Sequence, residues 1–390
     1  MTIRPDNSGK SKATAGRRHT VETISQLREI RIARGLGAAE IARRVGVSRQ
    51  TIHAIESGSY VPNTIVALQL ARVLEVSVEN LFSVNTENSS QPLDIDVELL
   101  TSRNEDHSTG ELVRIGRVGA RMVAVPAPRF PTFLSEADGA IATRRKTRAT
   151  VRPVADPASS LRSIVVAGCD PALSVLAGEL KILGIEVISA PGSSLEALTW
   201  LKKGLVHVAG THLRDHATGE YNLPLITSLF GKQNVHVVTF AEWEQGLVVR
   251  RSNPKRIRSV ADLAGEKIAI VNREKGSGAR DLLDRSLRAA NISPKNVPGY
   301  DRVLPTHLAA ALAVANSEAD CCVATTSVAR CLGLDFLPLS KERFDLVMES
   351  SQVDVAGIRL LLEALSRANL RNKLAALAGY DVRRTGEMLM

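Results

Sequence analysis

The sequence predicts two structured regions of different class, an N-terminal helical domain and a larger C-terminal α/β domain. Helical periodicity begins near Thr20 and continues to Phe82. From Leu161 onward, apolar runs of strand length alternate with helical segments, which is the pattern of a parallel sheet covered by helices. Because 390 residues also exceed what one hydrophobic core usually organises, we expect a multidomain protein of α and α/β class.

Composition shifts along the chain suggest where these regions begin and end. We expect a disordered basic arm at 1–19, a helical domain at 20–83, a linker with a small β-containing segment at 84–160, and the α/β domain at 161–390. Within the third segment, the run GELVRIGRVGARMVAVP predicts a short strand pair around Gly116 and Gly119. The basic stretch from Arg144 to Arg152 predicts a second linker.

Charge and composition narrow the class of partner. The net charge is +9 and the pI is near 9.6, which fits a polyanionic partner. Aromatic residues make up only 3% of the chain, which disfavours stacking on single-stranded nucleic acid. Duplex DNA that is read by a helix remains compatible with this composition.

The cysteines and the hydropathy pattern argue against a metal site and against a membrane protein. The four cysteines form no C-x-x-C pair and have no histidines at zinc-ligand spacing, so we expect buried free thiols and no metal. The basic N-terminus is not followed by an apolar stretch, and no run approaches the roughly 20 apolar residues of a membrane helix. We therefore expect a cytoplasmic protein without a membrane partner.

A short helix, a turn and a second short helix can be followed residue by residue in the N-terminal domain. The second predicted helix, at 39–45, ends at Gly46, which tolerates a left-handed backbone. Ser48 is suited to cap the third helix, in which Ile52 and Ile55 face the core. Such a third helix can dock in the major groove of DNA with its N-terminal residues on the bases.

The candidate DNA contacts are polar residues at the exposed end of this third helix. We expect Arg49 and Gln50 to read bases, because Arg pairs with guanine and Gln with adenine in a bidentate manner. The further candidates comprise the helix cap, two secondary base contacts and two phosphate contacts, namely Ser48, Thr51, His53, Arg43 and Arg44. A helical bundle used only for protein contacts is the alternative.

A longer run strengthens the DNA-binding hypothesis. Residues 35–82 read GLGAAEIARRVGVSRQTIHAIESGSYVPNTIVALQLARVLEVSVENLF, with an E-x-G turn after helix three and a closing N-L-F. This run resembles the lambda-repressor-type helix-turn-helix of the XRE family over the whole five-helix unit. The family often has Gln at the start of helix two, where it touches phosphate, whereas this chain has Ala38.

In the α/β domain, four loops follow predicted strands, at the edge where such sheets place ligands. The loops are 168–171, 191–194, 210–212 and 272–280. Two of them are Ser- and Gly-rich helix N-termini, whose free N–H groups favour anions. If the two ends face each other across a cleft, they would hold a small oxyanion. Walker, dinucleotide and G-x-S-x-G motifs are absent from the sequence, so we expect no catalytic residues and no enzyme.

Three runs in this domain carry a second resemblance. They read SLEALTWLKKGLVHVAGTHLRDHATGEYNLPLI, EQGLVVRRSNPKRIRSVADLAGEKIAIVNREKGSGARDLLD and GLDFLPLSKERFDLVM. They resemble the molybdate-binding-protein-like domain, a type II periplasmic-binding-protein fold, over about residues 161–385. The resemblance implies two lobes joined by strands near Leu247–Arg250 and Phe344–Met348. It also implies ligand-binding residues in lobe one, namely Cys169, Ser193, Ser194, Thr211 and Tyr221, and in lobe two, namely Arg273, Ser277, Gly278 and Arg280. Asp170 and His212, in the loops after the first and third predicted strands, complete the candidate ligand-binding residues.

Three hypotheses follow for the whole chain. The first is a one-component, homodimeric transcriptional regulator of double-stranded DNA whose C-terminal cleft binds a small anionic ligand; the resemblance favours molybdate or tungstate, and sulfate, another oxyanion or a small organic anion stays open. No cofactor is expected beyond that ion. The second is a molybdenum-cofactor-related enzyme or biosynthesis protein, for which Asp170 with His212 is the acid/base pair to test. The third is a phage-type repressor whose α/β domain only dimerises.

Overall fold

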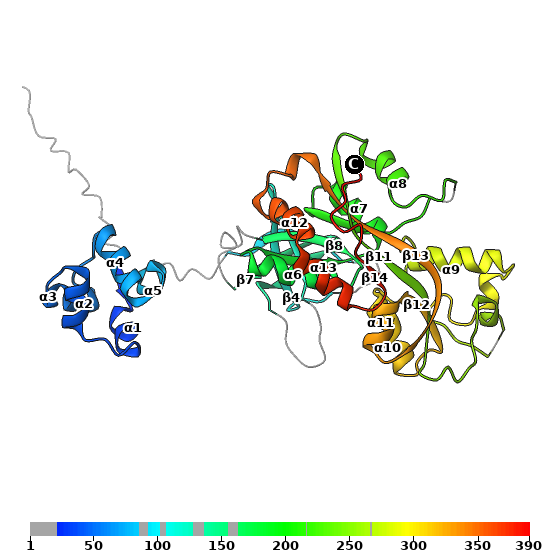
Figure 1. Cartoon of the computed structure of the whole chain (residues 1–390), viewed down its shortest axis with the longest axis horizontal. Coiled ribbons are helices and arrows are strands. Elements are labelled where there is room, and N and C mark those ends of the chain that lie inside the picture. The colour runs from blue at the N-terminus through cyan, green and yellow to red at the C-terminus, as the bar shows by residue number, and fades with distance from the viewer. Residues whose placement is uncertain are drawn as a thin grey trace, which may run out of the picture. The chain divides into compact units, whose positions relative to one another are not determined.

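The computed structural model of the chain describes residues 22–85, 93–101, 107–127, 136–154, 163–215, 217–265 and 267–390 (Figure 1). The chain divides into two compact units, Met1–Gln91 and Pro92–Met390. The predicted basic arm at 1–19 lies outside the described residues. Among the helices of the described part, none is both long enough and apolar enough to cross a bilayer.

The first unit is helical, as the sequence predicts. Its helices are α1 (Leu27–Ala33), α2 (Ala38–Val45), α3 (Arg49–Glu56), α4 (Thr64–Leu74) and α5 (Val78–Leu81). Its core contains Leu27, Ile41, Ile52, Leu70 and Leu81, all without exposed surface. The sequence did not predict the antiparallel pair of β1 (Glu22–Ser25) and β2 (Phe82–Asn85), which joins the two ends of the helical unit.

A closed barrel of five strands opens the second unit. The strands are β3 (Ile95–Leu99), β4 (Leu112–Val118), β5 (Arg121–Pro126), β6 (Gly139–Arg145) and β7 (Arg148–Pro153), which close in the order β3-β5-β4-β6-β7. The expectation of a short strand pair followed by a basic linker is therefore wrong for this segment. In β7 the arginines 148 and 152 are exposed, whereas Ala149 and Val151 are buried. The basic residues lie on the solvent face of a strand, and their charge obscures the alternation of buried apolar and exposed residues along it.

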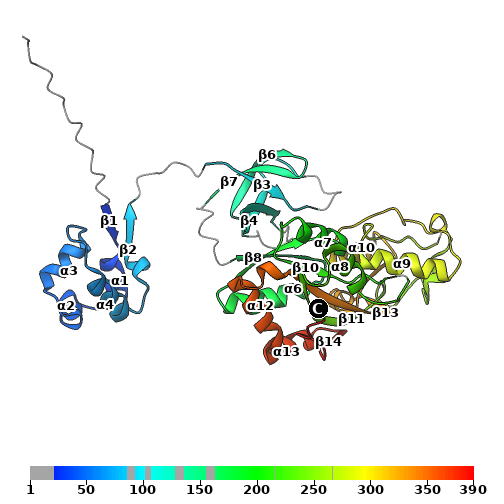
Figure 2. The same cartoon turned by 90° about the horizontal axis from the view of Figure 1, so that it is seen from above.

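The barrel packs directly on the α/β domain (Figure 2). Val118, Val123 and Val125 share one apolar cluster with Val165 of the α/β sheet. At Gly116 a side chain has no room, because a Cβ atom would lie 2.6 Å from Val165 Cγ2. The barrel and the α/β domain therefore form one packed body.

The α/β domain is built on a seven-stranded sheet with the order β12-β11-β13-β10-β8-β9, and β14 pairs with β11. Its strands are β8 (Ser163–Gly168), β9 (Glu186–Pro191), β10 (Val208–Thr211), β11 (Val235–Val249), β12 (Cys321–Thr325), β13 (Asp335–Glu349) and β14 (Tyr380–Asp381). Its α-helices are α6 (Leu173–Ile182), α7 (Ser194–Lys202), α8 (Leu223–Phe230), α9 (Gly278–Ala289), α10 (His307–Ala315), α11 (Thr326–Cys331), α12 (Ala356–Ser366) and α13 (Ala368–Ala376). Strands β8, β9 and β10 are parallel, but β11, β12, β13 and β14 pair in antiparallel fashion, so the expected parallel sheet is mixed.

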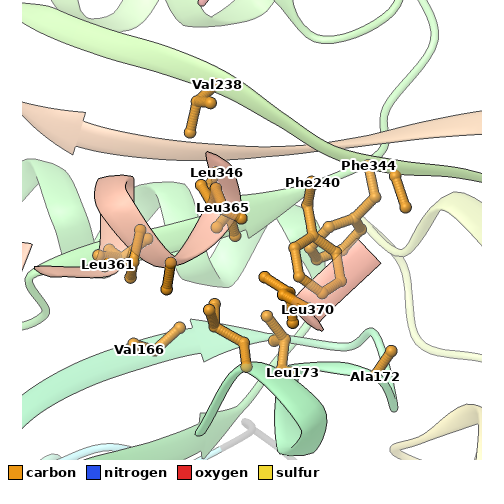
Figure 3. Close-up of a cluster of buried hydrophobic side chains, with 14 of the residues drawn as sticks. Val166, Ala172, Leu173, Val238, Phe240, Phe344, Leu346, Leu361, Leu365 and Leu370 are labelled. Atoms are coloured by element: carbon orange, nitrogen blue, oxygen red, sulfur yellow. The ribbon is translucent and has the colours of Figure 1, made fainter. Parts of the chain in front are cut away.

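Two long strands connect the two ends of this sheet. Strands β11 and β13 pair along their whole length, with register shifts at Thr239/Ala241 and Gln245/Gly246. On one side they meet β8–β10 with α6, α7, α8, α12 and α13, which we call the first half. On the other side they meet β12 with α9, α10 and α11, which we call the second half (Figure 1). Each half has its own apolar core, and Figure 3 shows Phe240, Phe344 and Leu365 in that of the first half.

One buried histidine of the first half makes the stability of the fold depend on pH. The Val165 N–H donates to His207 Nδ1 at 3.0 Å, and burial lowers the pKa of His207 from 6.5 to about 4. The unfolded chain therefore binds a proton between pH 6.5 and about 4 that the folded chain excludes. His207 alone should lower the free energy of unfolding by about 3 kcal/mol as the pH drops through this window, and this contribution is the difference between the wild type and a variant that lacks the ring.

Urea unfolding between pH 7 and 4 would measure this dependence. His207→Gln keeps an acceptor for the Val165 N–H without a titrating ring, and its free energy of unfolding should fall less than that of the wild type in this window, by about 3 kcal/mol. The half-buried His236, changed to Gln, is the control and should leave the dependence intact. An unchanged pH profile in His207→Gln would contradict this account.

Candidate functional site

The first candidate site is the N-terminal end of α3. Gly46 adopts a left-handed φ of 76° after α2, as the predicted turn requires. The Ser48 hydroxyl accepts a hydrogen bond from the Thr51 N–H at 3.0 Å and so caps α3. Ile52 and Ile55 are buried, which turns the opposite face of α3, with Arg49 and Gln50, toward solvent. Both proposed base readers are therefore exposed beside a capped helix start.

The side chains of the remaining predicted DNA contacts on α3 differ in exposure and in the hydrogen bonds that they already make. His53 is exposed, and its ring lies 3.4 Å from Arg49 Nε and 3.2 Å from a Glu56 carboxylate oxygen. The hydroxyl of half-buried Thr51 is hydrogen-bonded to Ser48 Oγ at 2.8 Å. Ser48 and Thr51 thus act first as parts of the helix cap.

The two predicted phosphate contacts lie at the end of α2. Arg43 and Arg44 are both exposed, and Arg44 forms an ion pair with Glu40 one turn earlier. A pairing that the sequence analysis missed is that of Arg31 with Glu56 at 2.6 Å, which ties α1 to α3. Glu56 is the acidic residue of the E-x-G turn, and this motif is the only local feature of the sequence that marks Glu56.

The second candidate site lies where the two halves of the α/β domain meet. Helix α7 of the first half begins after Ser193, which forms a capping box with Glu196. Helix α9 of the second half begins after Ser277, whose hydroxyl accepts from the Arg280 N–H at 3.3 Å. The Leu195 N–H at the start of α7 donates to the carbonyl that precedes Ser277, at 3.3 Å. The two Ser-rich helix N-termini predicted from sequence therefore face each other.

His212 occupies the centre of this junction. Its backbone N–H donates to Ser194 Oγ at 3.1 Å, and its Nε2 lies 3.3 Å from Cys169 Sγ. Its ring centroid is 4.8 Å from that of Trp243, and its Nδ1 is 3.8 Å from a Glu342 oxygen. Burial lowers the pKa of His212, but the Cys169 sulfur and the Glu342 carboxylate raise it by more, so the pKa ends above its ordinary value.

Several buried polar atoms near the junction have no hydrogen-bond partner among the described residues. They include both ring nitrogens of His307, Nη1 of Arg273, both amide atoms of Gln245, Nδ1 of His212, Nε1 of Trp243 and Oε1 of Glu342. Gln245 lies on the same face of β11 as Trp243, two residues away. Folded proteins rarely leave buried polar groups unpaired, so these atoms indicate a place for a ligand, an ion or water. His307, Trp243, Gln245 and Glu342 were missed because no local motif marks them.

The other predicted ligand residues have partners of their own. Thr211 donates to the Asn222 amide oxygen at 3.3 Å, and Tyr221 donates to the Lys341 carbonyl at 2.8 Å. Arg280 pairs with Asp284 at 3.2 Å and stacks over Tyr300. Arg280 also lines a groove of about 650 Å³ that reaches the junction at Leu195, Gly276 and Ser277. Thr211 and Tyr221 therefore lie beside the junction, where their hydroxyls are already hydrogen-bonded, whereas Arg280 lines the groove.

The acid/base pair proposed from sequence is not hydrogen-bonded. Asp170 accepts from the Ala172 N–H at 2.8 Å and from the Tyr380 hydroxyl. Burial raises the pKa of Asp170 to about 6. Instead, His212 Nε2 lies within hydrogen-bond distance of Cys169 Sγ, at 3.3 Å. The pair that the structure brings together is therefore a thiol and an imidazole.

Comparison with known proteins supports both domains. Residues 25–81 match a family described as a helix-turn-helix domain, and residues 178–366 match the PBP superfamily domain. The chain is 30% identical to the uncharacterized protein YvgK of Bacillus subtilis over 229 residues, which cover 58% of this chain and 74% of YvgK. It is 42% identical over 64 residues to an uncharacterized HTH-type transcriptional regulator of Methanothermobacter thermautotrophicus, covering 16% of this chain and 93% of the regulator.

Among solved structures, the sulfate-binding protein SubI of Mycobacterium tuberculosis is similar at 16% identity and a TM-score of 0.42, over 56% of this chain and 86% of SubI. The expected helix-turn-helix domain and periplasmic-binding-protein-like domain are confirmed by the family matches. The chain therefore belongs to the family of YvgK, and it carries the helix-turn-helix domain of the HTH-type transcriptional regulators in front of the PBP superfamily domain.

Proposed function

We propose that the protein is a ligand-responsive transcriptional regulator that reads duplex DNA with α3 and senses a small oxyanion between the halves of its α/β domain. Molybdate or tungstate is the favoured ligand. The observation that carries the proposal is the meeting of two Ser-capped helix N-termini, α7 and α9, beside Arg273, whose Nη1 has no hydrogen-bond partner in the part of the chain that the structure describes. Helix N-termini and a guanidinium all donate hydrogen bonds, which is what an oxyanion requires.

The ligand would act by holding the two halves together. The first half supplies Ser193 and His212, the second supplies Arg273 and Ser277, and β11 and β13 connect them as strands on which two lobes can move. A ligand that contacts both lobes favours the closed arrangement and, by linkage, changes the affinity for DNA.

We further propose that the regulator works as a homodimer in the cytoplasm. Paired α3 helices would read half-sites about 34–36 Å apart, one turn of the duplex. The exposed apolar side chains of Ile65 and Leu68 on α4 offer a surface that a second copy can cover. Light scattering on the purified chain should give twice the mass of 42.0 kDa, and a monomer at micromolar concentration would exclude this arrangement.

Thermal unfolding with molybdate, tungstate, sulfate and phosphate tests the ligand. An oxyanion at 100 times its Kd should stabilise the protein by about 2.7 kcal/mol. Ser277→Ala should weaken that stabilisation, whereas Ser259→Ala, which removes the cap of the 3-10 helix at Val260–Leu263, should leave it unchanged. If no oxyanion stabilises the wild type, a repressor whose α/β domain only dimerises becomes the better explanation.

A further inference from the structure

The junction also brings together a sulfur and two imidazoles. Cys169 follows β8 and His212 follows β10, both in the first half, whereas His307 opens α10 in the second half. One ligand atom from each of the three lies within 4.8 Å of the others. Their exposed fractions are 9%, 0% and 1%, so all three side chains are buried.

His307 is the member that hydrogen bonding does not explain. Neither of its ring nitrogens has a partner among the described residues, although the side chain is buried. An imidazole in the interior normally donates one hydrogen bond, and leaving it unpaired costs about 1–3 kcal/mol. Coordination of an ion would satisfy one nitrogen of His307 and give its burial a reason.

His212 shows a second feature of metal-binding histidines. Its Nε2 faces the Cys169 sulfur at 3.3 Å, while Glu342 lies behind the ring at 3.8 Å from Nδ1. Histidine ligands usually have a carboxylate, a carbonyl or water at the nitrogen that does not bind the metal. Glu342 is the carboxylate on this side of the ring; at 3.8 Å it is an ion-pair contact and not a hydrogen bond, so it must approach His212 slightly before it can orient the ring in this way.

The donor set selects a class of ion. A thiolate and two imidazoles suit Zn²⁺ or Cu⁺, whereas Ca²⁺ and Mg²⁺ require oxygen ligands. Bonds of about 2.0–2.3 Å in a tetrahedral site place ligand atoms about 3.3–3.8 Å apart. The distance of 3.3 Å from Cys169 to His212 fits this range, and the widest separation needs a closure of about 1 Å.

We propose that Cys169, His212 and His307 form a binding site for a late first-row transition-metal ion such as Zn²⁺, and that the ion links the two halves of the α/β domain. This inference goes beyond oxyanion sensing, which needs no metal. The positive charge of Arg273 near His307 is offset in part, because its Nε and Nη2 pair with Glu274 at 3.0 and 2.9 Å. Three protein ligands leave a fourth position for water or an anion oxygen.

Metal binding by the full chain tests the site. Metal-free protein should bind one Zn²⁺ per chain in competition with a chromogenic chelator, and Co²⁺ should give a thiolate charge-transfer band. Cys169→Ser should abolish the band, and His307→Gln should weaken Zn²⁺ binding at least tenfold. The matched controls are Cys331→Ser, at an exposed cysteine, and His236→Gln; both should bind as wild type.

Glu342→Gln gives a variant that keeps all three ligands, and it should weaken Zn²⁺ binding about tenfold. Circular dichroism of each metal-free variant checks that it is folded. Absence of stoichiometric Zn²⁺ binding by wild type, or binding that folded Cys169→Ser and His307→Gln retain, would overturn the site. In that case, an oxyanion-induced thermal shift in metal-free protein would still support the proposed oxyanion sensing. Conversely, Zn²⁺ binding without any oxyanion-induced shift would support the metal site and contradict oxyanion sensing.

Discussion

Gly278→Ala is expected to lower the affinity for the ligand of the α/β domain about 100-fold, without unfolding either half. Gly278 is the first residue of α9, and a Cβ atom there would lie 2.2 Å from His212 Cε1 and 2.5 Å from the His212 carbonyl oxygen. The carbonyl belongs to the backbone of the opposite half and cannot rotate away. Because overpacking of this kind costs about 1–3 kcal/mol or more, the closed arrangement is the state that the alanine destabilises.

Ligand titration followed by thermal unfolding measures this effect. The matched control is Gly178→Ala on the exposed face of α6, where a Cβ meets nothing within 4 Å. That change should keep ligand affinity and raise stability by up to about 1 kcal/mol, since alanine favours a helix over glycine. Normal ligand affinity in Gly278→Ala would mean that the halves do not approach each other when the ligand binds.

The helical unit was predictable because its signals are local. Gly46, the Ser48 cap and the buried pair Ile52 and Ile55 lie within ten residues and determine one turn and one helix face. The pair of β1 with β2 depends on residues about 60 positions apart, and no short-range pattern marks it. The pairing of such segments is determined by tertiary structure and not by local sequence.

The barrel was missed for another reason. Its strands carry arginines at solvent-facing positions, as Arg148 and Arg152 do in β7, and the charge outweighs the alternation of small apolar residues between them. Strand direction was hidden as well, because an apolar run such as β11 looks the same in a parallel or an antiparallel pair. The mixture of parallel and antiparallel strands in this sheet could therefore be established only from the tertiary structure.

At the ligand site, the sequence identified residues that belong to a loop motif and missed those that do not. Ser193 and Ser277 are helix caps and could be recognised from their neighbours. Trp243 and Glu342 face each other across β11 and β13, in register but about 100 residues apart in the chain. His307 lacks any spacing relation to Cys169, so the expectation that no metal is bound rested on local spacing alone.

Arg49→Ala is expected to remove sequence-specific DNA binding. Arg49 is the first residue of α3, its side chain is exposed, and its Nε donates to His53 Nε2 at 3.4 Å. A bidentate contact from arginine to guanine contributes about 1–3 kcal/mol, or about 5- to 160-fold at each half-site. A dimer that reads two half-sites would lose about 30- to 25,000-fold, and binding should fall toward the level of unrelated duplexes.

An operator selected from random duplexes and titrated by fluorescence anisotropy would measure this loss. Arg34→Ala is the matched control, because Arg34 caps α1 and pairs with Glu75 at 3.0 Å, away from α3. The control should bind the operator as wild type does, and Arg49→Ala should keep the ligand-induced thermal shift. Operator affinity that survives in Arg49→Ala would place base recognition on another element.

Removal of a predicted phosphate contact should change DNA affinity in a different way from removal of a base contact. Arg43→Ala should weaken binding to the operator and to unrelated duplexes by a similar factor, and should reduce the salt dependence by about one counterion. Loss of selectivity in Arg49→Ala together with preserved selectivity in Arg43→Ala would separate base reading from backbone attraction. That contrast matters for a chain of net charge +9, because general attraction to DNA alone would produce some binding in every variant.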